Sequence, residues 1–183
     1  LVVEYARDLH EKEAKEKASE ITPDNGKTYI TVIGSRSITD NPEAVAMFRS
    51  YVEALNALNS KSVDIVMRSG GAAGADTIAD EAFRGEKEII LPFQPKGRAL
   101  RDEEIVYSHD AEAENTVRRL HPIGNRIVTE DKYKTTKPYL ERDVIEVIGP
   151  VGKDGMREPA SSIVIGWTEP NREGITMHTE FRD

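Results

Sequence analysis

Short apolar runs that alternate with stretches of helical spacing constrain the fold of this 183-residue chain more than any other feature. Each run is rich in β-branched or aliphatic residues, as buried parallel strands are. The four runs cover residues 29–34, 63–67, 88–93 and 162–167. The helices between them are expected over residues 43–58, 75–83 and 139–148. This alternation predicts an α/β domain with a mainly parallel sheet and right-handed crossovers.

The segments outside this alternation define the predicted domain boundaries. Residues 1–26 are expected to form an N-terminal helical arm, because good helix formers dominate up to Glu20 and a turn over Pro23–Gly26 follows. The α/β domain then covers residues 27–183. The sequence does not begin with Met, and it is compatible with a domain that is cut short at Asp183.

The region after the third apolar run is harder to interpret. Residues 97–120 are charged with scattered apolar positions, which predicts one or two helices. Residues 121–138 contain two prolines and a glycine and are expected to form a long loop, as are residues 149–159. A last helix is expected to begin near Glu173, after the fourth run.

The composition is that of a soluble protein with a strongly charged surface. The formal net charge is −8, and an acidic chain repels nucleic acid and anionic membranes unless its basic residues cluster. The chain has no cysteine, which excludes disulfides and thiolate zinc sites and fits a reducing compartment. No apolar run approaches the ~20 residues of a membrane span. We therefore expect a cytoplasmic protein with no membrane partner.

A glycine-rich turn at Arg68–Asp76 is the strongest functional signal. It follows a predicted strand and precedes a predicted helix, and its small residues let the backbone approach a ligand closely. Backbone N–H groups at the start of the following helix offer a site for an anion such as phosphate. The turn supplies the ligand-binding candidates Ser69, Gly70, Gly71, Ala72, Gly74 and Asp76. The alternative is a tight strand–helix turn without a ligand.

Two more loops are expected beside this turn, because the carboxyl ends of parallel strands meet at one edge of a sheet. In the loop after the first strand, Ser35 could donate to a phosphate and Arg36 could pair with it; a capping serine and a surface arginine are the alternative. The loop after the last strand adds Thr168 and, at the next helix start, Gly174 and Thr176. The binding candidates from these two loops are Gly34, Ser35, Arg36, Thr168, Gly174 and Thr176. Trp167 could stack on a base or belong to the core.

The titratable residues offer few catalytic candidates. Asp76 and Glu180 are the carboxylates nearest the predicted site, so they are the candidate catalytic residues, although Asp76 could cap the turn and Glu180 could be a surface residue. The four histidines, at positions 10, 109, 121 and 178, show no helical metal-ligand spacing. We therefore expect no metal ion and no cofactor.

The three loops together resemble those of the SLOG superfamily of Rossmann-like proteins, over roughly residues 28–183. This group includes the DNA-processing protein A family and the Lonely Guy phosphoribohydrolases, related to lysine-decarboxylase-like proteins. The most specific likeness is Gly70–Asp76, which is similar to the Gly-Gly-Ala-x-Gly-Ala-Asp pattern of the small YspA-like members. The pair Arg142-Asp143 resembles the Arg-Asn pair of phage-type members, with Asp in place of Asn. The resemblance implies a Rossmann-like three-layer sandwich, adds Arg142 as a ligand-binding residue, and implies a homo-oligomer.

The sequence departs from the hydrolytic branch of the superfamily. It lacks the Pro-Gly-Gly-x-Gly-Thr-x-x-Glu motif, and Ile175 stands where the late turn of the superfamily has its second glycine. Three residues after Thr176 stands Thr179, and Glu180 comes one position later. One position rotates a helical side chain by about 100°, so Glu180 is a poor substitute for the catalytic glutamate.

Three functions follow in order of preference. The first is a module that binds a nucleotide or an NAD-derived small molecule, as a sensor, carrier or sequestering protein. The second is hydrolysis of a nucleotide N-glycosidic bond, with Asp76 or Glu180 near the ribose and Arg36 or Arg142 on the phosphate. The third is binding of single-stranded DNA, which the net charge and an aromatic content of 6% disfavour. A local basic patch for DNA could comprise Arg118, Arg119, Arg126 and the stretch Lys132–Lys137. The resemblance of Arg142-Asp143 to phage-type members favours a phage protein, which would act in the host cytoplasm.

Overall fold

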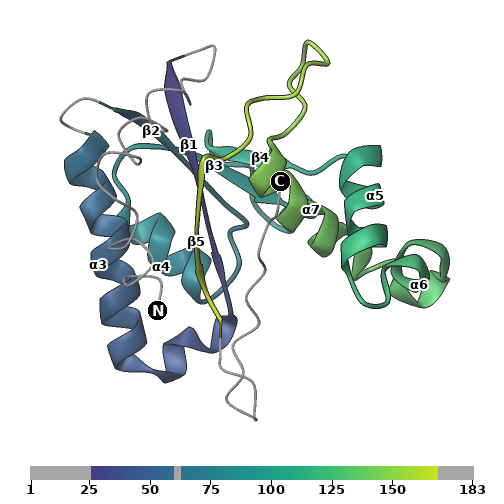
Figure 1. Ribbon diagram of the computed structural model, residues 1–183, viewed down its shortest axis with the longest axis horizontal. Helices are drawn as coiled ribbons and strands as arrows, with labels where there is room; N and C mark the ends of the chain where they lie inside the picture. Colours follow the sequence, from purple (N-terminus) through teal and green to yellow (C-terminus); the bar gives the residue numbers. More distant parts are fainter. Residues whose placement is uncertain (1–25, 60–62, 169–183) are drawn as a thin grey trace, which may run out of the picture.

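A five-stranded, fully parallel sheet forms the centre of the protein (Figure 1). The computed structural model describes residues 26–59 and 63–168. Within these residues the strand order is β4-β3-β2-β1-β5. The strands are β1 (Lys27–Gly34), β2 (Asp64–Ser69), β3 (Glu86–Leu91), β4 (Glu104–Val106) and β5 (Ile163–Trp167). The α/β class predicted from the sequence is confirmed.

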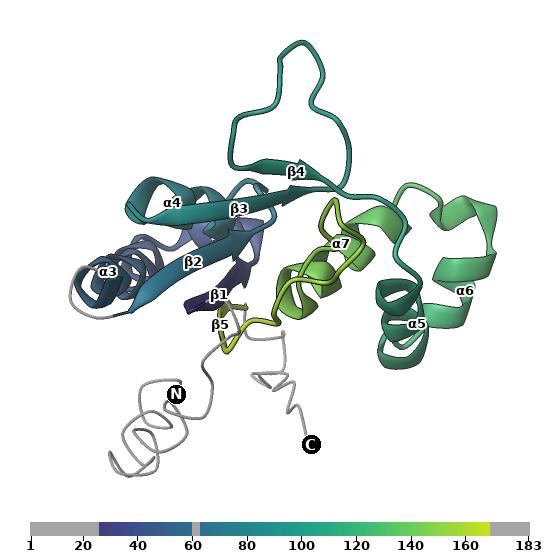
Figure 2. The same ribbon diagram turned by 90° about the horizontal axis from the view of Figure 1, so that it is seen from above.

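Helices cover both faces of the sheet, which gives three layers (Figure 2). The crossover helices α3 (Pro42–Asn59) and α4 (Ala75–Ala82) lie on one face, and α7 (Lys137–Ile148) lies on the other. Asn41 starts α3 by accepting a hydrogen bond from the N–H of Ala44 through its side chain, and Pro42 is the first helical residue. The predicted helices over 43–58, 75–83 and 139–148 are confirmed to within two residues at each end.

The main core lies between the sheet and the α3–α4 layer. In β1, Ile30 and Val32 belong to this core together with Phe48 and Val52 of α3. The residue between them in β1, Thr31, serves the opposite face, where its hydroxyl donates to the backbone carbonyl of Glu146 in α7. The strand is therefore buried on both sides, which explains its continuous apolar sequence.

The region after β3 differs from the sequence prediction. Residues 97–120, expected to be helical, contain the edge strand β4 before α5 (Ala111–Leu120). Glu104 of β4 is buried, and Arg98 and Arg101 donate hydrogen bonds to its carboxylate. These two long side chains therefore cover a strand of only three residues.

Residues 121–138, expected to be a loop, contain helix α6 (Gly124–Thr129) and the short 3-10 helix η2 (Asp131–Tyr133). A Cβ atom on Gly124 would overlap the backbone carbonyl oxygen of Val117 in α5. The glycine therefore permits helix–helix contact, whereas the sequence analysis took it as the mark of a loop.

Several predictions fall outside the described residues. These are the N-terminal helical arm and the last helix, with Gly174, Ile175, Thr176 and Glu180. Among the helices of the described ranges, none is both long and apolar enough to cross a membrane.

Candidate functional site

The loops after β1 and β2 meet the end of β5 at the carboxyl edge of the sheet. The N–H of Ser35 after β1 donates to the carbonyl of Trp167 in β5 over 3.0 Å. A Cβ atom on Gly34 would lie 2.7 Å from the same carbonyl oxygen and 2.8 Å from Cβ of Ala75 in α4. Gly74 packs on the same loop, since a Cβ atom there would lie 2.6 Å from Cα of Arg36. Glycines thus let the loops after β1 and β2 and the end of β5 approach one another closely.

These loops flank the switch point of the sheet. The chain passes from β1 to β2 on one side of β1, whereas β5 joins β1 on the other side. In open α/β sheets, crevices at such points form outside the carboxyl ends of the strands and are the usual place for a ligand. The candidates Gly34, Ser35 and Arg36 lie at this point, and Thr168 follows β5 with its side chain exposed. Trp167 packs against the main core, in line with the alternative reading of this residue.

The glycine-rich turn closes on itself through side-chain hydrogen bonds. Gly71 and Gly74 have φ angles of 62° and 97°, which favour glycine. Oδ2 of Asp76 accepts the N–H of Ala72 over 3.1 Å, and Oγ of Ser69 accepts the N–H of Gly71 over 3.3 Å. Asp76 is 2% exposed, so it acts as an internal brace of the turn.

The amino end of α4 faces this edge without a side-chain cap. Gly74 is the residue before the helix and makes no capping hydrogen bond through a side chain. Gly71 and Ala73 are exposed at the tip of the turn. A helix amino end carries partial positive charge and unpaired N–H groups, so it can accept an anion.

The two polar residues of the first loop have different surroundings. Ser35 caps the 3-10 helix η1 (Arg36–Asp40) by accepting the N–H of Ser37 through its hydroxyl oxygen over 3.3 Å. Arg36 is exposed. Arg36 is therefore the candidate side chain in this loop with a guanidinium available to solvent.

Arg142 lies in a cluster of carboxylates. Its Nη1 atom is 2.5 Å from Oε1 of Glu146 and 3.6 Å from Oδ2 of Asp76, and its Nη2 atom is 3.3 Å from Oδ1 of Asp143. A Cβ atom on Gly70 would overlap Nη1 of Arg142, so this glycine makes room for the guanidinium at the end of β2. The predicted ligand-binding arginine thus joins α7 to the glycine-rich turn.

The closeness of three carboxylates around one guanidinium favours protonation of the carboxylates. Burial raises the pKa of Asp76 and raises the pKa of Glu146 well above its ordinary value. Loss of hydration, together with the negative charge of Asp76, raises the pKa of Asp143 to about 6. The positive charge of Arg142 opposes this shift. Oδ1 of Asp76, Oε2 of Glu146 and Nε of Arg142 are buried without a hydrogen-bond partner. Asp76 and Glu146 are therefore buried carboxyl groups with raised pKa values, and Asp143 is the partly exposed member of the cluster.

Arg68 lies outside this cluster and is fully buried on β2. Its guanidinium lies 4.0 Å from the ring centre of Tyr29, and it donates to Glu88, to Glu158 and to the carbonyl of Pro159. Burial, followed by the hydrogen bond to Glu158, raises the pKa of Glu88 to about 7, although Arg68 opposes the shift. Arg68 therefore anchors the segment before β5.

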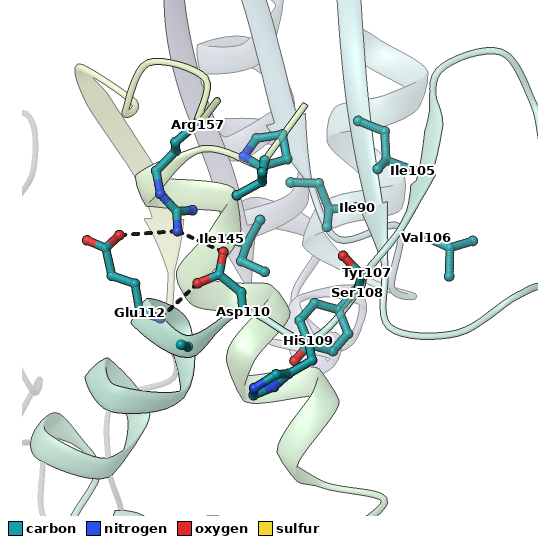
Figure 3. A pocket seen from close by; sticks show the side chains of 13 residues that line it. Ile90, Ile105, Val106, Tyr107, Ser108, His109, Asp110, Glu112, Ile145 and Arg157 are labelled. Atoms are coloured by element: carbon teal, nitrogen blue, oxygen red, sulfur yellow. Dashed lines mark hydrogen bonds and ion pairs between the residues drawn. The ribbon is translucent and has the colours of Figure 1, made fainter. Parts of the chain in front are cut away.

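A pocket of about 370 Å³ lies apart from the glycine-rich turn, between β3, β4, α5 and α7 (Figure 3). Ile90 and Ile145 belong to its apolar wall, and Arg157 bridges Asp110 and Glu112 at its rim. None of its lining residues comes from the turn at 68–76. Tyr107 and His109 also line it.

The basic residues suggested for DNA are largely paired with carboxylates. Glu114 contacts Arg118 and Lys137, and Glu130 contacts Arg126 and Lys132. These ion pairs reduce the positive potential that a nucleic-acid groove needs.

The sequence analysis missed two groups of residues. Asp143 was noted only for its resemblance to a family motif, and Glu146 was not singled out, although Glu146 lies four positions after Arg142, the spacing of a helical ion pair. The other group joins His109, Glu114 and Glu141, whose possible ligand atoms lie within 4.8 Å of one another. Glu141 lies far from the other two residues along the chain, so no local spacing indicates the group.

Comparison with known proteins finds no match for this chain. No protein-family model matches the chain, and no curated protein and no solved structure matches it either. The fold therefore defines the protein as an α/β protein with a five-stranded parallel sheet, which is consistent with a Rossmann-like fold.

Proposed function

We propose that this protein binds a nucleotide or a nucleotide-derived molecule at the carboxyl edge of the sheet, with the phosphate at the amino end of α4. The observation that carries this proposal is the contact between Gly74 and Arg36. It brings the backbone of Arg36, whose side chain is exposed, against the start of α4, which has no side-chain cap. Backbone N–H groups and a guanidinium are the donors that phosphate groups prefer.

The contacts of the other candidate residues give them structural roles beside the phosphate site. Arg142 is already paired with buried carboxylates, so the phosphate-binding charge falls to Arg36. Asp76 braces the turn from within, and Ser35 caps η1. The remainder of the nucleotide would extend along the carboxyl ends of β1 and β5.

A thermal-shift screen against mononucleotides, NAD, ADP-ribose and cyclic nucleotides tests this proposal. A ligand at 100 times its Kd stabilises the folded state by about 2.7 kcal/mol, which the melting temperature reveals. Arg36→Gln should abolish the shift. Arg84→Gln is the matched control, because Arg84 is also exposed but precedes β3 at the opposite edge of the sheet. The absence of a shift with every compound would overturn the proposal.

Hydrolysis of an N-glycosidic bond is the second candidate function. The exposure and the raised pKa of Asp143 favour it. Its side chain is 37% exposed and its pKa is raised to about 6, so it could hold a proton for a leaving base near neutral pH. Of the two carboxylates expected from the sequence, Asp76 is too enclosed for this part, and Glu180 lies outside the described residues.

Chromatography of each binding nucleotide after incubation separates binding from hydrolysis. Release of a free base by the wild type, with its loss in Asp143→Asn and retention of the thermal shift, would establish the hydrolase. Unchanged nucleotide after long incubation leaves the binding function alone.

A further inference from the structure

Three side chains that commonly bind metal ions converge beside the pocket between β3, β4, α5 and α7. His109 follows β4, Glu114 lies in the first turns of α5, and Glu141 lies in α7. One possible ligand atom from each lies within 4.8 Å of the other two. Nδ1 of His109 is 3.9 Å from Oε2 of Glu114. The group therefore joins α7 to the segment that contains the loop after β4 and the start of α5.

Glu141 adds a buried carboxylate oxygen that lacks a hydrogen bond. The residue is 1% exposed, and its Oε2 atom accepts the hydroxyl of Tyr107. Its Oε1 atom is buried without a hydrogen-bond partner. Buried polar atoms in folded proteins nearly always have a partner, so such an oxygen indicates an acceptor that a cation can satisfy.

An ammonium group already lies among these carboxylates. Nζ of Lys137 is 2.5 Å from Oε2 of Glu114 and 3.6 Å from Oε1 of Glu141. The position between the two carboxylates is thus suited to a positive charge. Lys137 is the first residue of α7, and its flexible side chain can turn outward when another cation takes this position.

We propose that His109, Glu114 and Glu141 bind one divalent transition-metal ion in the place of the Lys137 ammonium group. One imidazole with two carboxylates suits Zn²⁺ better than Mg²⁺ or Ca²⁺, which prefer oxygen ligands alone. Three protein ligands leave a fourth coordination position open. His109 also lines the pocket, so this position lies near a space that a small molecule could enter (Figure 3).

Metal binding requires a small contraction of the group. Ligands about 2.0–2.1 Å from a tetrahedral Zn²⁺ ion lie roughly 3.3 Å from one another. The side chain of His109 is 65% exposed, so it can move toward the two carboxylates without disturbing the core. The ion would then connect the end of β4 to α5 and α7.

Isothermal titration of the full chain with Zn²⁺ in metal-free buffer tests the proposal. We expect one ion per chain, weaker binding by about tenfold or more in His109→Gln and in Glu114→Gln, and tighter binding in Lys137→Met. His121→Gln is the matched control, since His121 lies at the other end of α5 and does not belong to the group. It should bind as the wild type does.

Other results would overturn the assignment. One is the absence of Zn²⁺ binding by the wild type. Another is wild-type affinity in both His109→Gln and Glu114→Gln, which would attribute binding to other histidines. Unchanged affinity in Lys137→Met would show that the ion does not take the ammonium position. Far-UV circular dichroism of each variant before titration excludes unfolding as the cause of weaker binding.

Discussion

The guanidinium of Arg142 occupies the space that a side chain on Gly70 would need. Gly70 directly follows β2, and Arg142 reaches it from α7, which is distant in the sequence. The pairing fixes the position of α7 over the carboxyl edge of the sheet. It also holds Asp76, the brace of the glycine-rich turn, close to the positive charge of Arg142.

Gly70→Ala should therefore destabilise the protein. The added methyl group must displace a buried guanidinium, and overpacking of this kind costs about 1–3 kcal/mol, with further loss if the ion pairs break. Urea unfolding measures the change. Gly166→Ala is the control, because a Cβ atom there meets its nearest neighbour at 3.6 Å, an ordinary contact. Equal stability of the two variants would contradict the close packing of Arg142 on Gly70.

Arg142→Met should destabilise the protein more at pH 8 than at pH 5. Removal of the guanidinium leaves buried carboxylates without a counter-charge, at a cost of about 3–5 kcal/mol when they are ionised. The pKa of Glu146 is raised, and that of Asp143 is about 6, so protons relieve part of this cost at pH 5. Urea unfolding at both pH values checks this, and Glu146→Gln added to Arg142→Met should recover part of the loss at pH 8. A pH-independent loss would show that the carboxylates are not coupled to Arg142.

Because the pKa of Glu88 is raised, the wild type should lose stability as the pH rises from 4.5 to 7. Its pKa is about 7 in the folded protein and 4.5 in an unfolded chain. In this interval the folded state keeps a proton that the unfolded state has released, so the free energy of unfolding falls with increasing pH. Relative to Glu88→Gln, the wild type should lose about 1–3 kcal/mol between pH 4.5 and 7.5. Parallel pH profiles of the two proteins would contradict the raised pKa.

Asp110 should stabilise α5 in two separable ways. Its Oδ1 atom accepts the N–H groups of Glu112 and Ala113, and its Oδ2 atom is 2.8 Å from Nη2 of Arg157. Asp110→Asn preserves a capping oxygen and removes the charge, whereas Asp110→Ala removes both. We expect thermal unfolding to show an additional loss of about 1 kcal/mol in the alanine variant. Identical melting temperatures of the asparagine and alanine variants would mean that the cap contributes nothing to stability.

Elements with many apolar positions at one period were predictable from the sequence. The helix α3 illustrates this, because Phe48, Val52 and Leu55 all face the core at helical spacing. The strand β4 was not predictable, because its three residues are too few to show alternation. Glu104 is buried there only because Arg98 and Arg101 neutralise it, and these are tertiary contacts.

The candidate site was predictable to a similar extent. Parallel strands must end at one edge, so the meeting of the loops at Gly34 and Gly74 followed from the predicted topology. The partners of Arg142 did not follow, since Asp76 reaches it from another layer of the fold. The resemblance suggested Arg142 as a ligand-binding residue and gave no sign that buried carboxylates surround it.

The strand order has a consequence for synthesis of the protein. β1 lies inside the finished sheet, yet its neighbour on one side, β5, is the last strand of the described sequence. A chain growing from its amino end can pair β1 with β2 early, but Ile30 meets Ile163 only after nearly all of the described domain has left the ribosome. Until then one edge of an apolar strand, with its backbone N–H and carbonyl groups, is open to pairing with other chains. The nascent protein should therefore depend on chaperones most strongly just before β5 emerges.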